Sequence, residues 1–253
     1  MNWQNTASCF AARWWTFRRA PTIAVMFESD GSSPGRDEEV LEAGVVPLFP
    51  LVGGILLPGA VMPLHIFESR YRQMVGDALA GDQRLAMAVL EDGHDEEYLQ
   101  SPPIGRTVCV GRIITHELLA DGRYNLLLLG LFRAHVVREV VGEGEPKPYR
   151  LAEYVQVQEP PVMEIDLAND RQRLLSLFSE PVFESIPVGR KLRELVRSSR
   201  GTAEVADVVG YHLVMDAGAR RRLLEETDRR RRVSKVVSAV ADVLPRLKSP
   251  PAE

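Results

Sequence analysis

The stretch from residue 57 to residue 75 decides the fold, and it reads LPGAVMPLHIFESRYRQMV. Pro58-Gly59 is typical of a turn, because proline presets φ and glycine accepts a positive φ. Residues 61–67 then predict an extended strand. A helix follows, because apolar side chains recur at three- and four-residue spacing on one face, and Gly81 ends it. The helical stripe consists of Tyr71, Met74, Val75, Ala78 and Leu79.

On both sides of this stretch, as far as residue 157, the sequence favours strands. Residues 45–51 contain Pro47 and Pro50, which predicts an edge strand or a bulged strand. Asp121-Gly122 predicts a hairpin with a type I′ turn, in which both central residues have positive φ. The remaining predicted strands are Leu85–Leu90, Val108–Leu119, Tyr124–Val137 and Leu151–Val157.

After Pro160-Pro161 the pattern becomes helical. Thr202 is predicted to cap one helix and Asp228 another, because short polar side chains accept hydrogen bonds from the first turn. Pro245 interrupts the apolar pattern of the last helix. The predicted helices are Asp170–Phe178, Val188–Val196, Thr202–Met215, Ala217–Glu226 and one following Asp228, with its stripe at Val233, Val236, Val237, Val240, Val243 and Leu244. Strands followed by helices predict an α+β fold.

The chain is therefore expected to have four parts: an extension and linker at 1–44, a β-rich lobe at 45–160, a helical lobe at 161–248 and a tail at 249–253. The first 25 residues hold three arginines, no acidic residue and all three tryptophans. The arginines interrupt the apolar stretch that a secretory signal needs. A targeting peptide, or a disordered or mis-started extension before Met26, are the interpretations left open.

Composition excludes several classes of protein. A net charge of −4 gives no whole-molecule attraction to nucleic acid. Cys9 and Cys109 do not make a disulfide framework, which is typical of the reducing cytosol, so a cytoplasmic location is predicted. No apolar run approaches the ~20 residues of a membrane span. The five histidines are not paired at helical spacing, so no metal site is expected. No cofactor is expected either.

At this point the sequence resembles the N-terminal, substrate-binding domain of Lon proteases. The resemblance rests on ordered blocks over about 110 residues, and its helical continuation is weaker. These blocks are residues 46–51, residues 57–75, Pro103-Ile104-Gly105 with residues 110–113, residues 121–126 with Gly130, and residues 147–150. The resemblance implies a PUA-like, bulged β-barrel followed by a helical bundle.

The resemblance also implies a domain without chemistry of its own. Neither the ATPase phosphate loop nor a usable serine–lysine pair occurs, since Ser234 and Lys235 are neighbours on a helix and point apart. Residues 31–35 fit G-x-S-x-G, but Pro34 has no backbone N–H for an oxyanion hole. We therefore expect a stand-alone, non-enzymatic form.

As a function, the resemblance implies recognition of unfolded or damaged polypeptides, for proteolysis by an ATP-dependent protease or as an adaptor. An apolar groove between the β-rich lobe and the helices is the expected site. The candidate residues can equally be core or turn residues. They are Met62, Leu64, Phe67, Arg70, Tyr71 and Met74.

Two alternatives remain. One is a small-ligand regulatory domain, by analogy with the Lon-like region of cereblon, although the zinc cysteines of cereblon's ligand-binding domain are missing here. The other is nucleic-acid binding by the arginines of residues 220–222 and 229–232, which the interspersed acids and missing aromatics disfavour. A solvated helix face or an acidic partner fits that cluster better. The candidate partner-binding residues are Arg221, Arg222, Arg230 and Arg231.

Overall fold

The computed structural model describes residues 41–91, 102–140, 146–186 and 188–248. They belong to one compact unit of the chain, residues 40–253. The predictions for residues 1–40, including the G-x-S-x-G segment and the choice between extension and targeting peptide, lie outside the described residues. The predicted tail at 249–253 also lies outside them.

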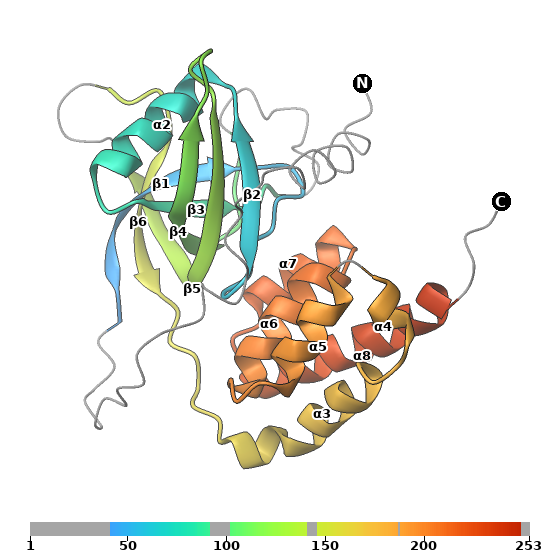
Figure 1. Cartoon of the computed structure of the whole chain (residues 1–253). Coiled ribbons are helices and arrows are strands. Elements are labelled where there is room, and N and C mark those ends of the chain that lie inside the picture. The colour runs from blue at the N-terminus through green and yellow to red at the C-terminus, as the bar shows by residue number, and fades with distance from the viewer. Residues whose placement is uncertain (1–40, 92–101, 141–145, 187, 249–253) are drawn as a thin grey trace. The chain divides into compact units, whose positions relative to one another are not determined.

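Six strands of the described residues form one sheet in the order β2-β5-β4-β3-β1-β6, and pairing of β5 with β6 closes it into a barrel (Figure 1). All pairs are antiparallel except β1 with β3. Register shifts interrupt the β4–β5 and β5–β6 ladders, so the predicted bulged barrel is confirmed. The strands are β1 (Ala43–Pro50), β2 (Val61–Ile66), β3 (Arg84–Ala88), β4 (Thr107–Leu118), β5 (Tyr124–Val140) and β6 (Leu151–Gln156).

Of the two interpretations of residues 45–51, the edge strand is wrong, and the pairings of β1 with β3 and β6 include no register shift that would mark a bulge. The first half of β1 pairs with β6 and its second half with β3. Pro47 is the last residue in register with β6, and Leu48 is the first in register with β3. A proline without an N–H is tolerated here because the strand changes partner at this point.

The predicted hairpin forms between β4 and β5, but its turn is not type I′. The N–H of Gly122 donates to the carbonyl of Leu119, and the N–H of Leu119 donates to the carbonyl of Arg123. Gly122 has a φ of 79°, whereas Asp121 has no positive φ. The loop is therefore a three-residue connection, a turn followed by one left-handed glycine, which also favours Gly after Asp.

The barrel interior is filled mostly by small and branched side chains. They come from the five strands that close the barrel and alternate along each strand, as one face of a sheet does. Four of the nine are alanines, which allows opposite walls of the barrel to approach closely. The cluster is Val46, Leu48, Ala86, Ala88, Val108, Val110, Ala134, Ala152 and Tyr154.

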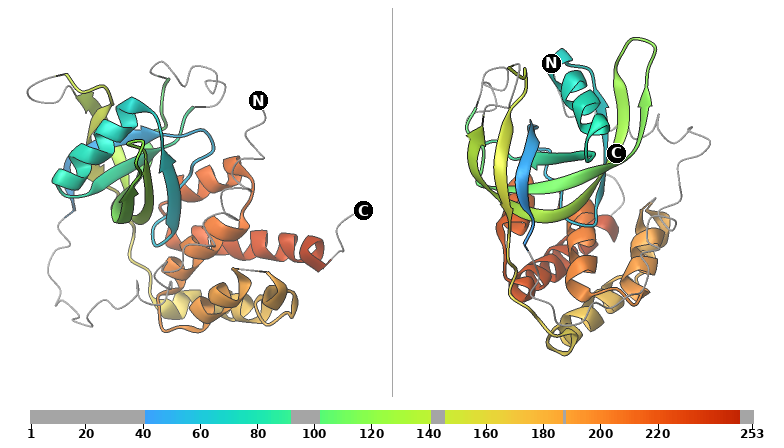
Figure 2. Two further views of the ribbon diagram at one scale, coloured as in Figure 1. Left: turned by 45° about the horizontal axis from the view of Figure 1, so that its top comes forward. Right: turned by 90° about the vertical axis from the view of Figure 1, so that its left-hand side faces the viewer.

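One helix accompanies the strands, and the others follow them, so the predicted α+β class with a C-terminal helical region is confirmed. Figure 2 shows α3–α8 as a group distinct from the sheet. The helices of the described residues are α2 (Ser69–Ala80), α3 (Glu164–Leu177), α4 (Val182–Ser185), α5 (Gly189–Arg197), α6 (Thr202–Leu213), α7 (Ala217–Glu225) and α8 (Arg229–Lys248).

The predicted capping of these helices is right at one position and wrong at another. Asp228 Oδ1 accepts hydrogen bonds from the N–H groups of Arg230 and Arg231 at the start of α8. Thr202 is not a cap but the first residue of α6, and its hydroxyl donates to Glu164 at 2.6 Å. The α8 helix also continues through Pro245 to residue 248.

The turn at residues 57–60, which begins the stretch 57–75, joins the barrel to the helices. The N–H of Ala60 donates to the carbonyl of Leu57, and Gly59 has a φ of 76°, as a type II turn with proline and glycine at its centre requires. The Leu57 carbonyl lies so close to β5 that a Cβ on Gly130 would be 2.4 Å from its oxygen. On the other side, Leu57 reaches Gly210 of α6. One hydrophobic core therefore runs from β2 and α2 through this turn into the helices.

Candidate functional site

The six residues predicted for peptide binding divide by burial. Met62 and Leu64 of β2 and Tyr71 and Met74 of α2 lie in the core, none more than 7% exposed. Phe67 is 52% exposed. Arg70 is half-buried; its Nε donates to Glu68 at 2.9 Å and its guanidinium lies over the Tyr71 ring. Without rearrangement, a peptide can reach Phe67 and Arg70 but not the other four.

Phe67 directly follows β2 and extends one face of the β2–β5 pair, and the centre of this face is apolar. Val61 lies opposite Leu129, and Pro63 lies opposite Leu127, so these pairs share a face of the sheet. Pro63 is exposed and the other three are half-buried. We call these four residues together with Phe67 the outer face; the stacked rings of His65 and Phe67 connect Phe67 to it.

Polar side chains border the outer face where β2, β5 and β4 lie side by side. His65 Nδ1 is 2.8 Å from Asn125 Oδ1, and Asn125 donates to Glu117. Pro63 stands in β2, which pairs within the described residues only with β5. Since a proline cannot donate to a further strand, the free edge of β2 is protected from strand addition, and the outer face itself remains the accessible feature.

The predicted apolar groove between the β-rich lobe and the helices is occupied by packed residues where Leu57 joins them. Next to this core lies a buried ionic cluster. Arg133 of β5 makes a bidentate pair with Asp207 of α6 at 2.7 and 3.0 Å, and its side chain is 2% exposed. It also donates to the carbonyls of Leu223 and Leu224 and to Glu159. All five guanidinium donors are thereby satisfied.

Arg232 of α8 completes this cluster from the other side. Its Nη2 donates to Glu159 at 3.0 Å and its Nη1 to the carbonyl of Glu226. Its Nε lies 2.9 Å from Asp207 Oδ1 at an angle too poor for a hydrogen bond, so that contact is ionic. The cluster therefore connects β5, α6, α7, α8 and the segment before α3. Its role is structural, since both carboxylates are occupied by arginines.

The electrostatics of the cluster agree with its geometry. Burial raises the pKa of Glu159, but Arg133 and Arg232 outweigh it, and the net pKa is lowered. The nearby thiol of Cys109 is fully buried, and burial raises its pKa to about 12. A thiol with that pKa is protonated at neutral pH and is a poor nucleophile.

The four arginines predicted to bind an acidic partner already have acidic neighbours. Each lies within 4 Å of a carboxylate of the chain, and three of these contacts are with residues at most six positions away. Surface pairs of this kind are weak, so they do not prevent binding, but they lower the local positive potential. The pairs are Arg221–Glu225, Arg222–Asp216, Arg230–Asp166 and Arg231–Asp228.

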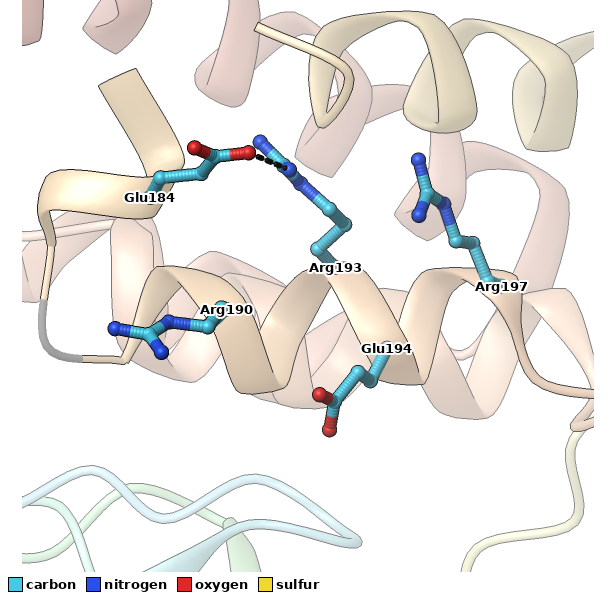
Figure 3. A pocket seen from close by; sticks show the side chains of 5 residues that line it. All are labelled: Glu184, Arg190, Arg193, Glu194 and Arg197. Atoms are coloured by element: carbon cyan, nitrogen blue, oxygen red, sulfur yellow. Dashed lines mark hydrogen bonds and ion pairs between the residues drawn. The ribbon is translucent and has the colours of Figure 1, made fainter. Parts of the chain in front are cut away.

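A separate hollow of about 530 Å³ lies at α4 and α5 (Figure 3). Arg193 turns across it to Glu184, with a hydrogen bond of 2.7 Å. Every residue that lines the hollow carries a charged side chain. Its lining residues are Glu184, Arg190, Arg193, Glu194 and Arg197.

The described residues contain no group of three histidine, cysteine or carboxylate side chains placed to hold a metal ion. Among the helices of these same residues, none has the length and apolarity that a bilayer crossing requires.

Sequence reasoning missed the ionic cluster and the hollow. Arg133 and Asp207, the central pair of the cluster, lie 74 positions apart in the sequence, and no local spacing marks such a contact. The hollow had a possible signal, the arginines at positions 190, 193 and 197 on one helix face. The outer face had one too, in the alternation of residues 61–67 beside a leucine-rich partner strand.

Comparison with known proteins identifies the fold. The family model of the ATP-dependent protease La (LON) substrate-binding domain matches residues 45–242. The N-terminal domain of a Mycobacterium avium complex Lon protease superposes with a TM-score of 0.61 at 20% identity, covering 79% of this chain and 99% of that one. A Lon N-terminal domain protein from Xanthomonas campestris superposes at 0.53 with 23% identity, covering 77% and 98%.

Curated relatives agree with the family match. A Lon protease of Trichlorobacter lovleyi is 24% identical over 209 residues, which cover 81% of this chain and 25% of that protein. Lon protease 1 of Bacillus subtilis is 22% identical over 201 residues, covering 77% and 24%. The chain spans about a quarter of the length of these relatives. Because the family match covers well over half of its residues, this protein belongs to the family of ATP-dependent protease La (LON) substrate-binding domains.

Proposed function

We propose that this protein binds exposed apolar segments of other polypeptides, as a recognition module without chemistry of its own. The family's description as a substrate-binding domain supports this proposal. The observation that carries it is Phe67, a large aromatic side chain that is 52% exposed on an apolar sheet face. Exposed apolar patches with a polar border are typical of protein interaction sites.

In this proposal, apolar side chains of an unfolded or damaged client cover the outer face. Phe67 is the anchor, because aromatic residues dominate the energetics of such contacts. The buried candidates Met62 and Leu64 support the strand from behind. Recognition by a patch, without directional backbone pairing at β2, suits clients of varied sequence.

The proposal extends to a partner and a location. Its relatives are named Lon proteases, so we propose that bound clients pass to an ATP-dependent protease of that type. We place the chain in the cytosol, where a buried free thiol such as that of Cys109 is ordinary.

Binding of a permanently unfolded, reduced and alkylated protein, followed by fluorescence anisotropy, tests the outer face. Full burial of a phenylalanine contributes about 1.5–3 kcal/mol, and roughly half of Phe67 remains to be buried. Phe67→Ala is therefore expected to weaken binding by about 1 kcal/mol, or about fivefold.

Met215→Ala is the matched control, because Met215 is 78% exposed and lies between α6 and α7, not on the outer face. The proposal is refuted if Phe67→Ala and Met215→Ala bind the unfolded protein equally well. Hydrolysis of ATP or cleavage of casein by the purified chain, absent from a mock preparation, refutes the non-catalytic part.

A further inference from the structure

We propose that the hollow at α4 and α5 is a second contact site, which takes an acidic helical segment of a bound polypeptide. This inference rests on the proposed function, because it supplies an electrostatic contact to the same class of ligand. It uses a different surface and different residues from the outer face.

The cations available for such a ligand are Arg190 and Arg197. Arg193 is already held, donating to Glu184 and to the carbonyl of Glu180. Arg190 and Arg197 are exposed, line the hollow and form no ion pair or side-chain hydrogen bond within the described part of the chain. These two guanidinium groups are therefore free to bind carboxylates.

The backbone spacing of the two arginines matches that of a helical ligand. Arg197 lies seven positions after Arg190 in α5, which corresponds to a backbone rise of about 10.5 Å and a rotation of only about 20°. Two carboxylates seven positions apart on a second helix repeat this geometry.

The charge pattern distinguishes a polypeptide from a nucleic acid. Glu194 lies between the two arginines in the sequence and also lines the hollow, without an ion pair in the described residues. It repels the continuous negative charge of a phosphate backbone, whereas a lysine between two ligand carboxylates complements it. The volume of about 530 Å³ lies within the range of about 300–1,000 Å³ typical of binding pockets.

The test is an NMR titration of the isotope-labelled full chain with an alanine-based helical peptide that carries two glutamates seven positions apart. The expected result is a set of amide shifts centred on α5. Arg190→Glu with Arg197→Glu is expected to weaken binding about 3- to 30-fold, since each exposed pair contributes about 0.2–1 kcal/mol and reversal adds repulsion.

The matched control is Lys191→Glu with Arg173→Glu, which makes the same change in net charge at exposed residues that do not line the hollow. Equal weakening in both variants overturns the proposal. Equal binding of a peptide whose glutamates are five positions apart, or of a short RNA, overturns it as well.

An uncharged apolar peptide separates this inference from the proposed function. Its shifts are expected on β2 and β5 and are expected to be unchanged in the Arg190→Glu, Arg197→Glu variant. If the apolar peptide binds and the acidic peptide leaves α5 unshifted, only the second site is refuted. If the acidic peptide binds at α5 and the apolar peptide does not bind, only the outer face is refuted.

Discussion

Replacing Asp207 by asparagine is expected to destabilise the protein more than any exposed charge substitution. The side chain keeps its shape but loses its charge between Arg133 and Arg232, which are each 2% exposed. Glu159 then faces both buried guanidinium groups alone. A buried cation without its counter-charge cannot be rehydrated in the folded state, so the free energy of unfolding falls.

The expected loss is about 3–5 kcal/mol, the cost of removing one partner from a buried pair. For a chain of this size, each kcal/mol corresponds to about 2–4 °C, so the melting temperature should fall by about 6–20 °C. Asp166→Asn is the matched control. Its partner Arg230 is 60% exposed, and an exposed pair contributes only about 0.2–1 kcal/mol.

Urea and thermal unfolding followed by far-UV circular dichroism measure these changes. Tryptophan fluorescence is less suitable, because all three tryptophans lie in residues 1–25, outside the described structure. The double variant Arg133→Met, Asp207→Leu is expected to recover most of the loss, because it leaves Arg232 balanced by Glu159. A loss below about 1 kcal/mol for Asp207→Asn, or no recovery in the double variant, contradicts the reasoning.

Three further predictions concern the same region. Gly130→Ala is expected to destabilise the fold by roughly 2 kcal/mol or more in urea unfolding. The reason is that its Cβ would lie 2.4 Å from the carbonyl oxygen of Leu57, a backbone atom that cannot turn aside. Unchanged stability would show that Gly130 and the Leu57 carbonyl are not in such close contact. Glu159 has a lowered pKa in the folded state, so its stabilisation is present above pH 4.5 and is lost as the pH falls through the folded pKa. Glu159→Gln is therefore expected to reduce the fall in the free energy of unfolding at acidic pH. An unchanged pH dependence of unfolding would contradict this. In a Cys9→Ser variant, Cys109 is expected to resist a thiol reagent at pH 8 until urea unfolds the chain, because burial raises its pKa to about 12; rapid native labelling would count against that burial.

Much of the fold could be predicted locally. The strands at residues 61–66 and 151–156, the hairpin around Gly122 and the Asp228 cap of α8 each depend on neighbours within a few positions. Side-chain periodicity and turn preferences act over that range, so a pattern can report them. The resemblance to the Lon substrate-binding domain likewise rested on short ordered blocks, and the family match confirmed it.

Burial and pairing between distant segments could not be predicted in this way. Arg232 lies in a run of four arginines that looks uniformly solvated, yet it alone is buried, because it faces Asp207 across the packed helices. Four of the six candidate peptide residues became core for the same kind of reason.

Short-range periodicity, turns and caps in the amino-acid sequence determined the order of the strands and of the helices other than the short α4 (Val182–Ser185). The family was indicated by the resemblance of short ordered blocks, and the family match confirmed it. Only the tertiary structure decided which charges are buried together, that β1 is an interior strand and that Phe67 stays exposed while its neighbours do not. Those outcomes depend on desolvation, and the water excluded from a side chain is set by segments that lie far away along the chain.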